Sequence, residues 1–454
     1  MGGGVRRVTL AVRVVTAVFL VVSTLVWGVG MAAAELTDET IVTKADVNYA
    51  SESGFGKAVA FSADGLTMVG GTNHDNIDGM SFHGSATVFT LSGGSWTEQA
   101  TLTQSDGEGG DMFGVSVAVS GDGSTFVSGM THDNVGGTSD QGSATVFTLS
   151  GSTWSEQATL TASDGAAGDM FGESVALSAD GNTLIVGAMT DTVGGASQQG
   201  SATVFTRSGN TWTQQQTIYT ADGAPYGMGG SGKGFGESVA LSADGSKSIV
   251  GALKHCAGDP GVCSGGSWQG SATVFTFSDG TWTEQATLVH SNGGANDYFG
   301  GALAVSEDGN TVVVGTVNNN VGSNNNQGSV AVFTRTDGTW TEQQILAKSD
   351  GASGDMFGES VALSADGNTL IVGAITDDVG GASQQGTATV FTRTDGTWTE
   401  QQILTQSDGA ASDNFGTSVA LSDDGTTALV GAPGDGPTGT GTGSATVFAR
   451  SDGT

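Results

Sequence analysis

The dipeptide Phe-Gly recurs seven times along the chain, and this recurrence constrains the fold more than any other feature. The spacings between successive copies are 58, 58, 64, 64, 58 and 58 residues. One run of twenty residues, from Asp169 to Ala188, returns unchanged from Asp355 to Ala374. A fixed period of this size is typical of repeat architectures, in which each copy packs against its neighbours. The seven phenylalanines are Phe55, Phe113, Phe171, Phe235, Phe299, Phe357 and Phe415.

Each copy contains the pattern of four short strands, which the third copy shows well. Residues Gly172 to Ala179 alternate between large and small side chains, which predicts a strand packed on both sides. Asp180-Gly181 predicts a hairpin turn, and Thr183 to Ala188 is an unbroken apolar run typical of a buried strand. Gly200 to Arg207 alternates again, and the polar segment Thr211 to Ile218 should be the most exposed strand.

This decrease in apolar character from the first two strands to the fourth favours a propeller. Neighbouring blades cover the inner strands of a propeller, whereas the outer strand of each blade faces water. A parallel β-helix would need shorter coils, and a sandwich would not repeat seven times. The predicted fold is therefore all-β: a seven-bladed β-propeller of four-stranded antiparallel blades.

The two ends of the chain suggest how the ring closes. The last copy stops at Thr454, before the polar fourth strand that follows the same motif in copies five and six. Near the other end, residues 39–46 match residues 401–408, and Leu36 stands where Trp398 stands. We expect the N-terminal strand to complete the last blade and to remove an open sheet edge. The alternative is that the chain is truncated before that strand.

The first 34 residues have the order of a secretory signal. A positively charged head containing Arg6, Arg7 and Arg13 precedes an apolar run over residues 14–29, and Ala32-Ala33-Ala34 follows. We expect cleavage after Ala34, although the apolar stretch is also long enough to serve as a retained membrane anchor. Residues 35–454 would then form the propeller outside the cell, secreted or at the cell surface.

The balance of charge excludes one large class of partners. Thirteen Lys and Arg residues against 46 Asp and Glu residues give a net charge of −33. Such a surface repels phosphate backbones, so we expect no nucleic-acid binding. A protein or glycan outside the cell is the expected partner, and the chain is expected to be a monomer. Contact with a membrane is expected only if the N-terminal segment is retained.

These motifs resemble the FG-GAP repeats of the integrin α-subunit head and of related extracellular proteins. The matching pieces are Phe171-Gly172, the run SVALSADG that follows, and Gly431-Ala432-Pro433 in the last copy. The resemblance implies a seven-bladed propeller that binds macromolecules outside the cell, often with Ca²⁺ between the first two strands. That turn has only one or two carboxylates here, fewer than such a calcium cage needs, so the integrin calcium sites are not carried over.

The fourth copy alone has a distinctive candidate binding patch. Insertions at Pro225 to Gly234 and at Leu253 to Gln269 should lie on one face, because loops between second and third strands open on the same side as the links between blades. Exposed aromatic and cationic side chains are common in binding hot spots. The alternative is a pair of neutral surface insertions. The candidate ligand-binding residues are Tyr226, Lys233, Lys254, His255 and Trp268, with Met228 beside them.

Cys256 and Cys263 are the only cysteines and lie inside the second insertion. In an oxidising compartment we expect them to form a disulfide that closes the loop. Zinc binding with His255 would supply only three ligands at an unconvincing spacing, so no metal site is assigned there.

Paired acids in the links between blades form a further candidate site. Together with acids from the second loops they would make a ring of negative charge that binds Ca²⁺ weakly. The favoured alternative is turn chemistry, in which these side chains hydrogen-bond to the local backbone; no cofactor is otherwise expected. The acids are Asp106, Asp111, Asp133, Asp164, Asp169, Asp191, Asp350, Asp355, Asp377, Asp408 and Asp413.

No catalytic constellation is evident in the sequence. The five histidines lie in different copies without a Ser or Cys partner pattern, and the phosphate-loop motif is absent. We therefore expect a binding or adhesion module rather than an enzyme. The alternatives are a passive cell-surface or matrix protein, and a carboxylate-dependent enzyme with an acidic pair in unmatched positions near the axis.

Overall fold

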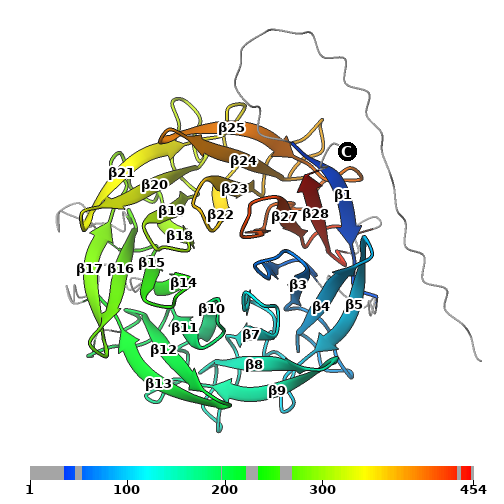
Figure 1. The fold of residues 1–454 in the computed structure, drawn as a ribbon, viewed down its shortest axis with the longest axis vertical. Coiled ribbons are helices and arrows are strands. Elements are labelled where there is room, and N and C mark those ends of the chain that lie inside the picture. The colour runs from blue at the N-terminus through cyan, green and yellow to red at the C-terminus, as the bar shows by residue number, and fades with distance from the viewer. Residues whose placement is uncertain are drawn as a thin grey trace, which may run out of the picture.

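Seven four-stranded sheets surround a central axis in the computed structural model, which describes residues 35–45, 54–195, 197–220, 234–255, 268–436 and 441–450. Figure 1 shows the sheets as the blades of a closed ring. All strand pairs within the blades are antiparallel. The predicted seven-bladed propeller is therefore confirmed. None of the described residues forms a helix long and apolar enough to cross a membrane.

The blades are numbered in chain order, and their strands run from the axis outward. Blade one contains β2 (Ala58–Phe61), β3 (Thr67–Thr72), β4 (Ser85–Ser92) and β5 (Ser95–Leu102). Blade two contains β6 (Val117–Val119), β7 (Thr125–Met130), β8 (Ser143–Ser150) and β9 (Thr153–Leu160). Blade three contains β10 (Phe171–Leu177), β11 (Thr183–Ala188), β12 (Ser201–Ser208) and β13 (Thr211–Ile218).

The remaining blades repeat this order. Blade four contains β14 (Phe235–Leu241), β15 (Lys247–Ala252), β16 (Ser271–Ser278) and β17 (Thr281–Leu288). Blade five contains β18 (Phe299–Val305), β19 (Thr311–Thr316), β20 (Ser329–Thr336) and β21 (Thr339–Leu346). Blade six contains β22 (Phe357–Leu363), β23 (Thr369–Ala374), β24 (Thr387–Thr394) and β25 (Thr397–Leu404). Blade seven contains β26 (Ser418–Leu421), β27 (Thr427–Ala432), β28 (Ser444–Arg450) and β1 (Leu36–Val42).

Burial within a blade differs from the predicted gradient at the first strand. In blade three, β11 is buried at every position but its first, β12 is buried over its first five residues, and β13 is the most exposed of the four strands, as predicted. The first strand, β10, is mostly half-buried, so the prediction that it packs tightly on both sides is wrong. Figure 1 gives the reason, because the first strands lie nearest the central opening, where no further sheet covers them.

The N-terminal strand closes the ring. β1 pairs with β28 over the register Asp38↔Ala449 to Val42↔Ala445, and Figure 1 shows it as the outer strand of the last blade. The backbone of Leu36 exchanges two hydrogen bonds with the Gln402 side chain of blade six, at 2.9 and 3.0 Å. Trp398 makes the same pair of bonds with Gln344 of blade five, at 3.0 and 3.1 Å. Leu36 therefore occupies the tryptophan position, and the predicted closure is confirmed.

The Phe-Gly motif joins each blade to the one before it. In every blade the phenylalanine packs against an aromatic ring of the third strand, as Phe357 does with Phe391 at a centroid distance of 6.0 Å. Its backbone also forms a parallel bridge to a glycine of the preceding blade, such as Gly328 to Phe357. Seven such bridges are present, and the bridge from Gly443 to Phe55 joins blade seven to blade one.

A second set of contacts connects the blades at the outer rim. The backbone amide of Ser105, in the link after blade one, donates to Glu156 of blade two at 2.9 Å. The amide of Ser407 donates in the same way to Glu39 of β1 at 2.8 Å. The N-terminal strand thus takes part in the rim contacts as the outer strands of the other blades do.

Candidate functional site

One face of the ring is built from the second loops of the blades and from the links between blades, and we call it the loop face. The link before blade three lies between two second loops. Its residue Gly168 accepts a hydrogen bond from the Thr190 side chain at 2.6 Å, and its amide donates to Ser139 of blade two at 3.0 Å. The prediction that both kinds of loop share a face is confirmed. The turns between first and second strands lie at the opposite ends of the strands, on what we call the hairpin face.

The blade-four loop brings two of the candidate binding residues together. The Lys254 ammonium lies 5.8 Å from the centre of the Trp268 ring, and both side chains are half-buried. The backbone of Trp268 exchanges hydrogen bonds with Asn296 of the next link, at 2.7 and 3.3 Å. An ammonium group over an indole ring is electrostatically favourable. This pair is therefore held to the scaffold at the point where the loop rejoins β16.

His255 lies differently from its two neighbours. Only 6% of its surface is exposed, and its backbone is fixed by hydrogen bonds to Ala252 and Gly270. Its position in the repeat is that of Asp75 and Asp377, which are also buried against the preceding link. The structure therefore places His255 within the junction between blades. Tyr226, Met228, Lys233, Cys256 and Cys263 lie outside the described residues, so the disulfide and their part in the patch stay predictions.

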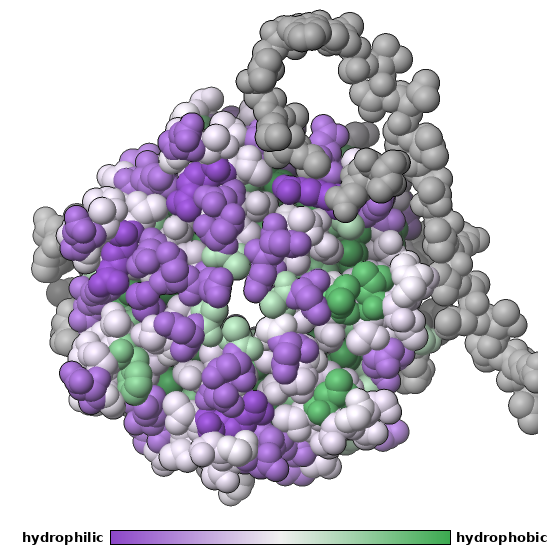
Figure 2. Space-filling model, viewed as in Figure 1, coloured by the Kyte–Doolittle hydropathy of each residue, from purple (hydrophilic) through white to green (hydrophobic). Residues whose placement is uncertain are grey.

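Two exposed hydrophobic residues beside blade four were missed by the sequence reasoning. Tyr219 precedes the blade and is 45% exposed, and Val289 follows it and is 39% exposed. The sequence contains a signal for them, because a threonine stands at the same link position in other copies, namely Thr103, Thr161 and Thr405. Tyr219 and Val289 lie in the links on either side of blade four, which also carries Trp268 and Lys254. The face seen in Figure 2 is largely hydrophilic, with small separate hydrophobic areas.

Blade one also presents an aromatic side chain in its second loop. Phe82 is 43% exposed, and its ring lies edge-on to that of His74 at 5.2 Å. Most other blades have a polar residue at this position, for example Asp140 and Gln384. An aromatic residue where the repeat is otherwise polar was the signal that sequence reasoning overlooked.

Three glutamates follow the Phe-Gly motif directly and belong to innermost strands of the ring: Glu173 in β10, Glu237 in β14 and Glu359 in β22. Burial raises the pKa of Glu173 and Glu359, and the Lys57 ammonium opposes this effect at both. Burial, with repulsion from Glu173 and Glu359, raises the pKa of Glu237 to about 7. A carboxyl group with this pKa is protonated in about half of the molecules at neutral pH. The tripeptide Phe-Gly-Glu, which occurs three times, is the sequence feature that could have identified these glutamates. The three acids occupy matched positions of the repeat.

In the turns of the hairpin face, the aspartate carboxylates accept hydrogen bonds from neighbouring residues of the same turn. Asp180 accepts hydrogen bonds from the Ser178 hydroxyl at 2.6 Å and from the Asn182 amide at 3.0 Å. Although burial opposes it, these bonds lower the pKa of Asp180. The Ser-to-Asp bond recurs in all seven blades at 2.6 to 2.7 Å. These aspartates therefore fix the hairpins.

The acids of the links make similar bonds. Asp169 and Asp355 each accept a hydrogen bond at 2.6 Å from the amide three residues earlier, and Asp111 and Asp413 make the same contact. The favoured interpretation as turn chemistry is confirmed for these four. Within the part of the chain that the structure describes, no group of three or more His, Cys, Asp or Glu side chains is arranged to hold a metal ion.

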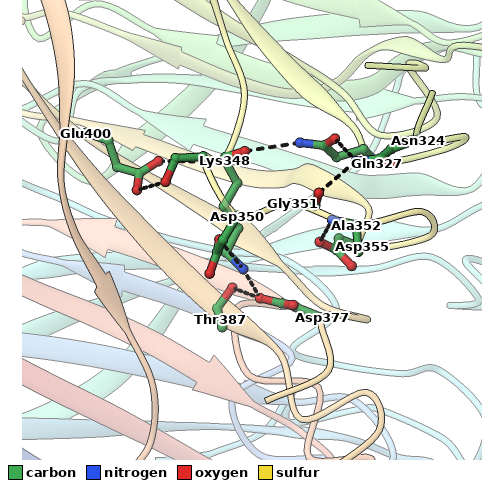
Figure 3. Close-up of polar contacts among 11 residues, drawn as sticks. Asn324, Gln327, Lys348, Asp350, Gly351, Ala352, Asp355, Asp377, Thr387 and Glu400 are labelled. Carbon is green, nitrogen blue, oxygen red and sulfur yellow. Dashed lines mark hydrogen bonds and ion pairs between the residues drawn. The ribbon is translucent and has the colours of Figure 1, made fainter. Parts of the chain in front are cut away.

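At four junctions the side chain of a link residue hydrogen-bonds to the second loop of the following blade. Between blades five and six, Lys348 forms ion pairs with Asp377 and, at 2.9 Å, with Asp350 (Figure 3). Thr387 donates a hydrogen bond to Asp377 at 2.7 Å. Although burial alone would lower it, hydrogen bonds to the two aspartates raise the pKa of Lys348. The cation is therefore part of the packing between two blades.

Comparison with known protein families identifies the family to which these repeats belong. The FG-GAP repeat profile matches residues 96–147, 154–205, 282–333, 340–391 and 398–448, which is more than half of the 454 residues. Each match runs from the outer strand of one blade through the third strand of the next. The two copies outside these matches are the one divided between blade seven and blade one and the one that carries the blade-four insertions. A comparison with curated proteins finds no match. The chain belongs to the FG-GAP repeat family.

Proposed function

We propose that this protein is an extracellular binding module that recognises a protein or a glycan through the blade-four loops of the loop face. The observation that carries the proposal is the contact between Lys254 and Trp268 on a rigid ring. Aromatic residues on a preorganised surface lose little conformational freedom on binding and are enriched in hot spots. The sequence of residues 1–34 supports a location outside the cell.

The surroundings of the pair support a role in binding. Tyr219 and Val289, in the links before and after the blade, add two exposed apolar side chains to this part of the ring. The other blades have shorter second loops that nearly repeat one another, so the long loop of blade four is the distinctive one. Because the patch combines an ammonium group with aromatic side chains, it fits acidic or hydroxyl-rich groups on a partner.

Protein and glycan arrays, followed by surface plasmon resonance on each hit, test this proposal. We expect the double variant Lys254→Ala, Trp268→Ala to weaken binding at least tenfold, a loss of about 1.4 kcal/mol. The matched control is Leu66→Ala, which removes a side chain that is 45% exposed in a turn of the hairpin face. This control should bind as the wild type does.

Two results would contradict the proposal. The first is equal affinity of the wild type and the double variant for every ligand found. The second is a wild-type protein that binds no member of either array. Circular dichroism of the double variant separates a lost contact from a lost fold, because the patch lies outside the hydrophobic clusters of the blades.

A further inference from the structure

The seven junctions between blades use equivalent positions of the repeat but differ in the side chains at these positions. At each junction a residue two places after the outer strand lies opposite a second-loop residue of the next blade and a Ser or Thr that begins its third strand. In chain order, the link residues are Lys44, Gln104, Ala162, Thr220, His290, Lys348 and Gln406. Their second-loop counterparts are Asp75, Asp133, Asp191, His255, Asn319, Asp377 and Asp435.

Two of these junctions hold a buried ammonium group. Lys44 forms an ion pair with Asp75 and donates to the Ser85 hydroxyl at 3.1 Å. Ser85 donates in turn to Asp75 at 2.7 Å. Figure 3 shows the same arrangement around Lys348, where the counterparts are Asp377, Thr387 and Asp350. The junction geometry is thus a receptor for a primary ammonium group, since it provides carboxylates whose charge the cation neutralises.

The junction between blades two and three has the receptor without the lysine. Asp191, Ser201 and Asp164 occupy the positions of Asp377, Thr387 and Asp350. The link residue is Ala162, whose methyl group supplies neither charge nor donor. Blades three and six are otherwise nearly identical in sequence, so the change from lysine to alanine is the main difference between the two junctions.

The electrostatics and the accessibility of this junction both follow from that change. Burial raises the pKa of Asp191, and the nearby charges of Asp169 and Asp164 raise it further, against a hydrogen bond from Ser201. Asp377 is 6% exposed and Asp75 is 2% exposed, whereas Asp191 is half-buried. Asp164 and its equivalent Asp350 are both exposed. The carboxylate of Asp191, whose equivalent is covered by a lysine elsewhere, is therefore within reach of an outside group, as the carboxylate of Asp164 is.

We propose that the junction between blades two and three binds a primary ammonium group of a ligand, such as a lysine side chain of a basic protein partner, through Asp191, Asp164 and Ser201. The bound ammonium takes the place that Lys348 fills in the equivalent junction. This site lies on the loop face but is separate from the Lys254 and Trp268 pair, and its test does not depend on that pair. The net charge of −33 favours the approach of a basic partner.

The test uses n-butylammonium chloride, which has the chain length of a lysine side chain, against tetramethylammonium chloride at equal ionic strength. We expect butylammonium, well above its Kd, to raise the Tm of the wild-type protein by about 2 °C relative to tetramethylammonium, because it binds the folded state. The variant Ala162→Lys, which supplies the ammonium internally, should lose this difference. The matched variant Lys348→Ala, which recreates the same junction in blade six, should show a larger difference than the wild type.

Each other outcome would overturn the proposal. Equal shifts in the wild type and Ala162→Lys would show that the amine acts elsewhere. A shift given by CaCl₂ and not by butylammonium, and lost in Ala162→Lys, would identify the junction as a site for a metal ion instead. If Ala162→Lys does not fold, Asp191→Asn replaces it, because removing the carboxylate should also abolish the difference; an unchanged difference in Asp191→Asn would refute the assignment.

Discussion

At the scale of single residues, one glycine in the second strand of each blade allows the next blade to approach. In β23, a Cβ atom on Gly373 would lie 2.0 Å from the carbonyl oxygen of Gly416 in blade seven. The equivalent glycine of blade seven, Gly431, meets Gly56 of blade one in the same way. The sequence motifs Phe-Gly and Val-Gly-Ala therefore describe two sides of one backbone contact.

Substituting Gly373 with alanine should destabilise the ring by about 3 kcal/mol, because the added methyl group forces neighbouring backbones apart. The measurement is the urea midpoint of unfolding. The control is Gly151→Asn, at a turn residue with φ of 63° and open space around it, where asparagine tolerates the left-handed conformation. A Gly373→Ala protein as stable as this control would contradict the contact.

Glu237 provides a prediction about pH. Its pKa in the fold is about 7, above its ordinary value of 4.5, so the charged form costs stability above pH 7, and this cost disappears as the pH falls toward 4.5. Glu237→Gln should therefore be more stable than the wild type at pH 8, by about 1 kcal/mol after allowance for screening by water.

At pH 4 the two proteins should have equal stability, since the wild-type carboxyl is then protonated in both states. Thermal unfolding at the two pH values provides the measurement. Glu284→Gln, on the exposed outer strand of the same blade, serves as the control and should show no such difference. A stability difference that is the same at pH 4 and pH 8 would argue against the raised pKa.

At the scale of elements, β1 is the strand on which the ring depends. Leu36 is 3% exposed and packs with Phe448 and Leu404, and Val42 is 7% exposed. Without β1, the edge of β28 would present unpaired backbone groups and an apolar surface to water.

Deleting residues 36–45 should therefore lower the Tm and produce oligomers visible in size-exclusion chromatography. Burial of a single large apolar side chain contributes about 1.5 to 3 kcal/mol, so the loss of several is a large part of ordinary domain stability. A synthetic peptide of residues 35–45 should restore the monomer, whereas the same peptide with Leu36→Asp should not. An unchanged Tm of the deletion variant would show that this strand does not stabilise the ring.

The strands show what could be predicted from the sequence and what could not. β11 and β13 begin and end where the pattern predicted, because alternating and unbroken apolar runs directly report which faces are covered. The half-buried state of β10 was missed, since small residues such as Ala176 suit both a packed strand and a strand beside an axial opening. Lys254 and Trp268 were identified because insertions break the repeat. Asp164 and Asp191 were named among the acids of a candidate ring. Their arrangement with Ser201 opposite Ala162 was not predicted, since it depends on residues far apart in sequence that meet only in the ring.

At the scale of the whole molecule, closure converts seven similar contacts into a continuous cycle. Each blade contributes its Phe-Gly bridge and its rim contacts to the next, and the last set joins the two ends of the chain. The loop face exists as a shared surface only because the ring is closed, so both binding proposals depend on this cycle. Its large negative charge favours solubility and discourages association between copies.

The most direct test of the closed ring is a disulfide between the first and last strands. Asp38→Cys and Ala449→Cys place two cysteines at paired positions of β1 and β28, in a background where Cys256 and Cys263 are replaced by serine. We predict an intramolecular link under dilute oxidising conditions, seen by peptide mass spectrometry, and none between Asp38→Cys and Ser150→Cys in blade two. Absence of the first link, or equal formation of both, would contradict a ring closed by its first strand.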